Sequence, residues 1–163
     1  MANPVKHPVA APKSVKFAVE PFGRVYREAQ HLMRLHWQEI AKNKTLLRIN
    51  PDLEKYMAAG KNLVTVTARD GDTLVGYFLW AMVPHPHYKH VEVAEEDLHY
   101  LHPEWRRGLA GYLFMKAACA AAAEAGAQLI VVREKIGHEH PAILKRLKFL
   151  PTDIVYTLAV PKA

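Results

Sequence analysis

The residues best suited to chemistry in this chain lie between positions 97 and 111, in the segment DLHYLHPEWRRGLAG. An apolar strand pattern ends there and a long helical pattern begins. The first turn of a helix exposes backbone amides at the positive end of the helix dipole. Arg106 and Arg107 add guanidinium groups, each with a fork of donors, and Gly108 and Gly111 let a ligand approach the backbone closely. This junction is a candidate site for an anion such as a phosphate, although an ordinary strand-to-helix turn with solvated arginines has the same composition.

Hydrophobic periodicity predicts the elements that must position this segment. Alternation of apolar and polar residues predicts strands, and an apolar residue every three to four positions predicts amphipathic helices. The expected strands span residues 15–19, 62–70, 73–83, 97–101, 128–133 and 154–160, and the expected helices span residues 24–43, 51–59, 105–125 and 141–148. Asp70-Gly71 predicts a tight hairpin turn between the second and third strands, because glycine allows the positive φ angle that the turn requires.

The order of these elements predicts the fold class and the domain organisation. Strands that alternate with helices indicate an α/β (α+β) fold, with a sheet covered by helices on both faces. The chain has 163 residues, of which 50% are hydrophobic, which suits one domain with a buried core. Residues 1–14 are rich in proline and lack an apolar signal core, so we expect a flexible N-terminal arm followed by a single domain over residues 15–163.

Charge and cysteine content narrow the function classes. The formal net charge of +6 favours anionic partners, namely nucleic acid, an anionic membrane surface or a phosphorylated small molecule. The basic residues are scattered, without a recognition helix or an aromatic platform, which disfavours nucleic acid. No apolar run approaches the ~20 residues that span a bilayer, so we expect no membrane partner. The single cysteine, Cys119, excludes an internal disulfide and is typical of a reducing compartment, so we expect a cytoplasmic protein.

The segment PEWRRGLAGYLF and the order of elements resemble the GNAT family of N-acetyltransferases over most of the chain. The acyl-CoA motif of that family is glutamine or arginine, two free positions, glycine, a free position, and glycine or alanine. With Arg106 in the first position, Leu109 stands in place of the middle glycine and Gly111 ends the motif, a variant that resembles phage-type members. The other register ends at Ala110 and puts Trp105 in the first position.

The resemblance implies an acyl-CoA N-acyltransferase type of fold. Its sheet would be mixed, mostly antiparallel and six- to seven-stranded, flanked by about four helices and splayed open between the strand that ends at Leu101 and the strand over residues 128–133. Acetyl-CoA, the acetyl donor, would bind in the opening, with its pantetheine paired to the β-strand backbone as an added strand would be. The implied donor-binding residues are Tyr100, Leu101, His102, Arg106, Arg107, Gly108, Leu109, Ala110 and Gly111.

In the family the amine attacks the thioester directly, so the reaction needs a general base for the incoming ammonium and an acid for the leaving thiolate. The residues that could act as the base lie on or just before the flanking strand; they are Glu95, Glu96, Asp97 and His99. We choose Glu96, since family members often carry an acidic residue near the start of this strand. The run of three acids could also be a solvated charged loop.

The general acid of the family is usually a tyrosine in the helix after the fifth strand, and this chain has Leu144 or a neighbour there. Tyr156 and His138 are the substitutes within plausible reach. Each of them could equally be structural, as a strand tyrosine that packs its ring or a turn histidine in solvent.

The resemblance implies transfer of an acetyl group from acetyl-CoA to a primary amine on a small molecule, a peptide or a protein. The alternatives are a basic nucleic-acid-binding module and a catalytically inactive CoA-binding protein of the same fold. Histidines with metal-like spacing occur at His85, His87, His90, His138 and His140, but no cysteine or carboxylate cluster completes a tetrahedral set, so we expect no metal. The sequence leaves open whether the protein forms a homodimer.

Overall fold

The structure is a computed structural model that describes residues 14–42, 44, 49–158 and 160. The expected N-terminal arm therefore lies almost entirely outside the described residues. The elements in chain order are β1 (Val15–Val19), α1 (Phe22–Ile40), α2 (Leu53–Ala58), η1 (Gly60–Asn62), β2 (Leu63–Asp70), β3 (Thr73–Pro84), β4 (Glu92–Leu101), η2 (Pro103–Trp105), α3 (Ala110–Glu124), β5 (Leu129–Val131) and α4 (Pro141–Arg146).

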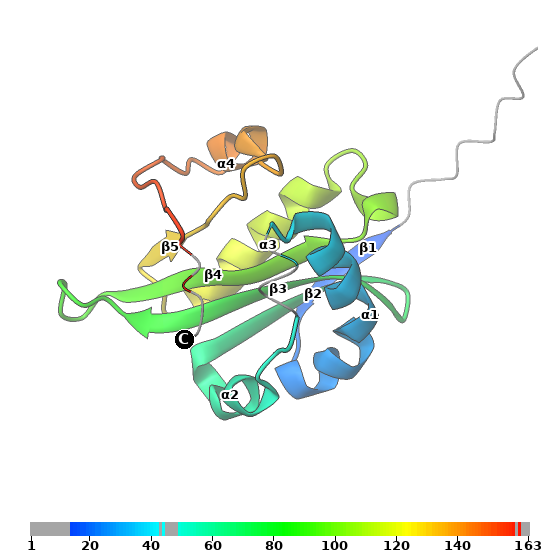
Figure 1. Cartoon of the computed structure of the whole chain (residues 1–163), viewed down its shortest axis with the longest axis horizontal. Coiled ribbons are helices and arrows are strands. Elements are labelled where there is room, and N and C mark those ends of the chain that lie inside the picture. The colour runs from blue at the N-terminus through cyan, green and yellow to red at the C-terminus, as the bar shows by residue number, and fades with distance from the viewer. Residues whose placement is uncertain (1–13, 43, 45–48, 159, 161–163) are drawn as a thin grey trace, which may run out of the picture.

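The five strands form one mixed sheet in the order β1-β2-β3-β4-β5. Neighbouring strands are antiparallel except β4 and β5, which are parallel and are connected through α3. Helices α1 and α3 cover opposite faces of the sheet (Figure 1). A parallel connection of this kind needs a crossover, and α3 supplies it.

The core has two layers because β3 is buried on both faces, as its apolar sequence predicts. On one face Phe78 and Trp80 pack with residues of α3, and the Trp80 indole donates a hydrogen bond of 2.9 Å to the Ala118 carbonyl. On the other face Tyr77 and Leu79 pack with residues of α1. The alternation along β3 therefore fixes both helices to the sheet.

Most of the expected elements are confirmed, including the hairpin at Asp70-Gly71, where Gly71 has a φ of +59°. The sheet has five strands within the described residues, not six to seven. The strand expected over residues 154–160 is wrong in the described part of that segment, which has no regular secondary structure, pairs with no other strand and is exposed. Alternation marks a segment that could enter a sheet, but a strand also needs a partner edge.

Other elements have different limits from those expected. The strand expected over residues 128–133 is shorter, since β5 spans only Leu129–Val131. Strand β4 begins at Glu92, so the acidic run at residues 95–97 lies within the sheet and not in a solvated loop. Helix α3 begins at Ala110 and not near Trp105, because residues 103–105 form a separate 3₁₀ turn and Gly108 adopts a φ of +62°, which interrupts helical geometry.

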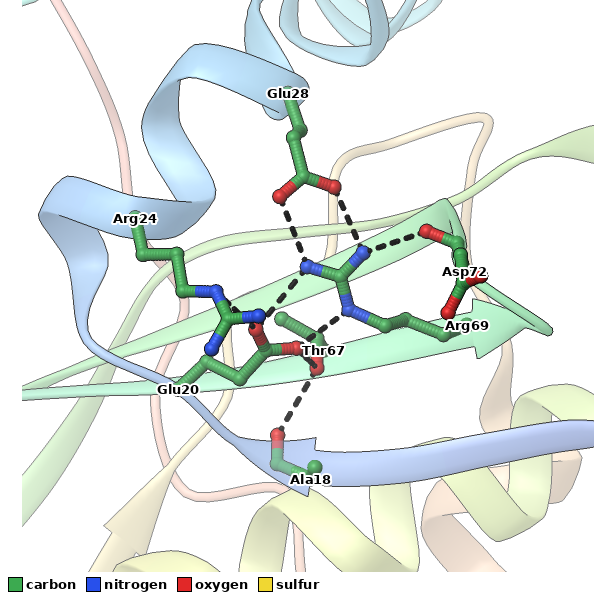
Figure 2. Close-up of polar contacts among 7 residues, drawn as sticks. All are labelled: Ala18, Glu20, Arg24, Glu28, Thr67, Arg69 and Asp72. Carbon is green, nitrogen blue, oxygen red and sulfur yellow. Dashed lines mark hydrogen bonds and ion pairs between the residues drawn. The ribbon is translucent and has the colours of Figure 1, made fainter.

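An ion-pair network fastens the first two elements to the hairpin (Figure 2). The Arg69 guanidinium on β2 donates to Glu20 at 2.6 Å and to Glu28 at 2.7 Å, and it also donates to the Asp72 carbonyl. Thr67 adds a hydrogen bond of 2.6 Å to Glu20. Hydrogen bonds from Arg69 hold the pKa of both carboxyl groups below the usual range.

We expect Arg69→Met to lower the free energy of unfolding by about 3 kcal/mol, since it removes the nearest cation of the Glu20 carboxylate, whose side chain is 12% exposed, and leaves only the exposed Arg24 at 3.8 Å. Urea denaturation at pH 7 measures this loss. Arg24→Met is the matched control, because the Arg24 side chain is 75% exposed and its ion pair should contribute less than about 1 kcal/mol.

The difference in stability between wild type and Arg69→Met should depend on pH. A carboxyl group whose pKa is lowered by folding contributes stability above its unfolded pKa and loses that contribution as the pH falls through its folded pKa. The difference in stability between wild type and Arg69→Met should therefore shrink below about pH 4. Equal losses for the Arg69 and Arg24 variants would contradict a stabilising role for the network.

Candidate functional site

The sheet opens between β4 and β5. The two strands pair only at Val93–Leu129, Ala94–Ile130 and Glu95–Val131. Within the described residues no strand pairs with β4 on this side beyond that point, and the chain that follows β5 turns away toward α4 (Figure 1). We call the region between residues 96–101 of β4 and the chain over residues 132–140 the splay.

A β-bulge in β4 decides which side chains face the splay. The register with β3 shifts so that Trp80 pairs with Glu96 while the preceding residue, Leu79, pairs with Leu98, which leaves Asp97 as an extra residue. Residues three positions apart on a regular strand point to opposite faces. The extra residue reverses this relation, so Glu96 and His99 lie on the same face.

Glu96 and His99 form a closely bonded pair. Glu96 Oε1 lies 2.6 Å from His99 Nδ1, and Glu96 Oε2 accepts a hydrogen bond of 3.2 Å from the backbone N–H of Arg133. The Glu96 side chain is 8% exposed, whereas that of His99 is 26% exposed. The His99 ring also stacks on Phe78, with centroids 5.1 Å apart. The pair therefore presents an oriented imidazole toward the splay and keeps the carboxylate behind it.

The two other acids of the run have separate partners. Glu95 forms an ion pair of 2.9 Å with the Arg133 guanidinium, which ties β4 to the chain after β5. Asp97 accepts a hydrogen bond of 2.6 Å from the Tyr56 hydroxyl of α2. Burial, followed by the contact with Asp97, raises the pKa of Tyr56 well above its usual value. Both acids therefore connect β4 to neighbouring elements.

His140, from the loop between β5 and α4, closes one side of the splay. Its ring meets that of His99 edge to face, with centroids 5.1 Å apart. Its backbone N–H donates to Glu134 Oε1, and its buried Nε2 has no hydrogen-bond partner. Burial and the neighbouring His99 lower the pKa of His140. From the sequence, His140 is a candidate only for metal binding. No local pattern in the sequence predicts its contact with His99, which lies 41 positions earlier.

Arg106 is already engaged by the protein. Its guanidinium donates to both carboxylate oxygens of Glu39 on α1, at 2.6 and 2.8 Å, and its Nε donates to the Leu101 carbonyl at 2.6 Å. The guanidinium also lies over the Tyr100 ring. His138 approaches the same Glu39 carboxylate at 4.0 Å. The structure thus joins α1, the end of β4 and the loop before α4 through one arginine.

The start of α3 keeps the features that favour an anion. Its N-cap residue, Leu109, makes no side-chain capping bond, so no side chain satisfies the first-turn amides. Gly108 has open space where a side chain would project, and Arg107 is exposed. Gly111 instead packs under α4, since an added Cβ would lie 3.3 Å from Ile143 Cδ1.

The other residues expected at the site lie at the end of β4, at the start of α3, or away from both. Tyr100 and Leu101 are buried at the end of β4, and His102 begins the turn into η2. Ala110 forms the first residue of α3. Tyr156 is 88% exposed and makes no contact with the splay among the described residues. The structure therefore brings His138, but not Tyr156, toward the Arg106 junction.

Two kinds of site have no support in the described part of the chain. It contains no group of three histidine, cysteine or acidic side chains that could hold a metal ion. None of its helices is long and apolar enough to cross a membrane.

A small cavity of about 210 Å³ lies away from the splay and is lined by Cys119, Ile130, Leu147, Lys148 and Phe149. Burial raises the pKa of the Cys119 thiol to about 11, so this cysteine is not an activated nucleophile.

Several solved structures with the same architecture are named as acetyltransferases. A ribosomal-protein-alanine N-acetyltransferase from Brucella melitensis biovar Abortus matches with a TM-score of 0.70 at 16% identity, over 92% of this chain and 99% of that chain. An aminoglycoside acetyltransferase from an uncultured soil metagenomic sample, in complex with trehalose, matches with a TM-score of 0.70 at 14% identity, over 91% and 97%.

A third structure, described as a predicted acetyltransferase with acetyl-CoA from Clostridium acetobutylicum, matches with a TM-score of 0.65 at 15% identity, over 90% of this chain and 96% of that chain. No protein-family model and no curated protein sequence matches this chain. At these identities the likeness is one of fold. The expected acyl-CoA N-acyltransferase type of fold is therefore confirmed, with five strands.

Beneath the end of β4, on the α1 face, lies a buried histidine. His36 Nδ1 lies 2.8 Å from the Tyr77 hydroxyl, and its ring stacks on Tyr100 with centroids 5.1 Å apart. Burial lowers the pKa of His36 to about 4. The native state therefore holds this imidazole neutral, while the unfolded chain protonates it near pH 6.5.

This difference predicts that the contribution of His36 to stability is complete above about pH 6.5 and is lost as the pH falls toward 4. We expect a loss of about 2 to 3 kcal/mol from this group, measured by urea denaturation at a series of pH values. His36→Gln should flatten that part of the profile, since glutamine does not titrate. His31→Gln, at an exposed position of the same helix, should keep the wild-type slope, and a wild-type slope in His36→Gln would contradict the assignment.

Proposed function

We propose that this protein is an N-acetyltransferase that moves an acetyl group from acetyl-CoA directly to a primary amine of a small molecule, a peptide or a protein. One observation carries the proposal: in a fold shared with acetyltransferases, an oriented carboxylate–imidazole pair and an uncapped helix start flank the opening between β4 and β5. The single cysteine is consistent with a cytoplasmic location, which belongs to the proposal, as does the phage-type register of the motif.

The residues at the start of α3 suit the diphosphate of the donor. The dipole of the helix attracts an anion to its start, which has no side-chain cap, and the open space at Gly108 lets phosphate oxygens approach the backbone. Arg107 is exposed and can add a charge-assisted hydrogen bond. Arg106 serves better as the residue that holds the junction together, since Glu39 and the Leu101 carbonyl already occupy its donors.

The donor supplies an acetyl thioester: the acceptor nitrogen bonds to the carbonyl carbon, the C–S bond breaks, and the sulfur takes up a proton. The protein must remove a proton from the acceptor ammonium, and the acids and His99 of β4 lie beside the opening where this would occur. Of the two candidate acids, His138 has structural support, because it lies near Glu39 and thus near Arg106.

The two alternative functions differ from this proposal in measurable ways. A nucleic-acid-binding module should lose affinity steeply as the salt concentration rises. Three of the arginines, Arg69, Arg106 and Arg133, each contact a glutamate, so they do not form part of a continuous basic surface. An inactive protein of the same fold would bind acetyl-CoA without releasing thiol in the presence of any amine.

We expect acetyl-CoA to raise the melting temperature of the wild-type protein, because a ligand that binds only the folded state stabilises it by mass action. Arg107→Met should weaken acetyl-CoA binding about 10-fold if its guanidinium contacts phosphate. Arg27→Met, which removes the same charge from an exposed position on α1, is the control. No melting shift at millimolar ligand would contradict the function, and equal affinities for the two variants would exclude the phosphate contact of Arg107.

A second prediction separates the two candidate acids. His138→Gln should lower kcat by about 10-fold or more with little change in acetyl-CoA affinity, since it removes a proton donor near the junction. Tyr156→Phe should leave kcat within about twofold of wild type, as its exposed hydroxyl has no contact with the site among the described residues. The assay is thiol release from acetyl-CoA with a panel of amines, polyamines and peptides, and the reverse ranking would make Tyr156 the acid.

A further inference from the structure

We infer that His99 is the general base of the acetyl transfer and that Glu96 is the residue that positions it. This inference rests on the proposed function and changes the assignment that the sequence favours, in which Glu96 itself takes the proton. It follows from how the β4 bulge places the two side chains and from what each of them contacts.

Glu96 is poorly placed to receive a proton from a substrate. One carboxylate oxygen is bonded to His99 Nδ1 and the other accepts from the Arg133 backbone N–H, so both oxygens already have partners. Its side chain is also nearly buried. A substrate amine would have to displace one of these bonds before it reached the carboxylate.

His99 has the free position that Glu96 lacks. Because a carboxylate only accepts hydrogen bonds, the contact with Glu96 assigns the hydrogen to Nδ1 and leaves the Nε2 lone pair available in the neutral ring. Within the described residues every hydrogen bond and ion pair of His99 uses Nδ1. The side chain is partly exposed at the splay, so a ligand can reach the ring.

The imidazole is held on several sides, as a base that acts on a positioned substrate should be. Phe78 stacks against one face, His140 meets the ring edge to face, and Glu96 holds Nδ1. A nucleophile or base oriented by a bonded third group is the arrangement that serves acyl transfer in enzymes generally. The same contacts restrict rotation of the ring, so Nε2 keeps one direction.

The charges around His99 favour its role as a proton acceptor. Glu96 on its own strand compensates an imidazolium, and Glu134 lies behind His140 in the adjoining loop. Burial and the neighbouring His99 lower the pKa of His140, and burial followed by the interaction with His99 lowers the pKa of His36 on the α1 side. Glu96 accepts from Nδ1 whether or not Nε2 carries a proton, so it keeps the ring oriented in both states.

The protons balance in this scheme. An ammonium acceptor loses one proton to Nε2 of His99, which later releases it to solvent. The nitrogen then forms its bond to the acetyl carbon, the C–S bond breaks, and the second proton of the nitrogen ends on the sulfur, so the products are an amide, a thiol and one solvent proton.

The test compares His99→Asn, Glu96→Gln and the exposed control His31→Gln in the thiol-release assay across pH. The asparagine amide can still donate to Glu96 but cannot accept a proton at the Nε2 position, so we expect kcat to fall about 100-fold and the acidic limb of the pH profile to disappear. Added imidazole should restore part of that activity. Glu96→Gln should lower kcat less than His99→Asn and move the acidic limb of the pH profile to lower pH, because the protonated ring loses its carboxylate partner.

The outcomes separate this inference from the proposed function. If wild type releases thiol and His99→Asn keeps the wild-type rate and pH profile, His99 is not the base. If Glu96→Gln loses more activity than His99→Asn, Glu96 is the base, as the sequence predicts. If wild type and His31→Gln release no thiol with any acceptor, the proposed function itself fails. A rise in melting temperature on adding acetyl-CoA, measured for each variant, shows that the variant is folded and still binds the donor.

Discussion

The site of this protein depends on one extra residue in β4. Asp97 has no partner of its own in the ladder with β3, and the bulge that it forms brings Glu96 and His99 to the same face. On a regular strand the carboxylate and the imidazole would lie on opposite sides of the sheet. The bulge can exist here because β3, buried on both faces and tied to α3 through Trp80, holds the rest of β4 in register.

Strand β4 also forms one border of the opening in the sheet, because it diverges from β5. The two strands pair over only three residues each, and then the chain after β5 is held to β4 by side chains. Arg133 contributes its backbone N–H to Glu96 and its guanidinium to Glu95. The opening is therefore bordered by ionised groups with defined partners, which keeps them in fixed directions in the absence of a ladder of backbone bonds.

Three arginines of this chain join distant segments. Arg69 joins β2 to the β1–α1 segment, Arg106 joins the β4–α3 junction to α1, and Arg133 joins the chain after β5 to β4. Each of the three bonds to glutamate, so these guanidinium groups have partners within the protein.

The sequence by itself determined most of the elements, because strand and helix periods and the Asp70-Gly71 turn act over a few neighbouring residues. It also pointed to the junction before α3 as a candidate anion site and to the acidic run that lies in β4. Only the tertiary structure decided that Arg106 bonds to Glu39, that His140 lies against His99, and that the segment after residue 150 pairs with no other strand among the described residues. These outcomes depend on register and on contacts between residues far apart in the chain, and a local pattern of residue types carries no information about which distant partner a side chain meets.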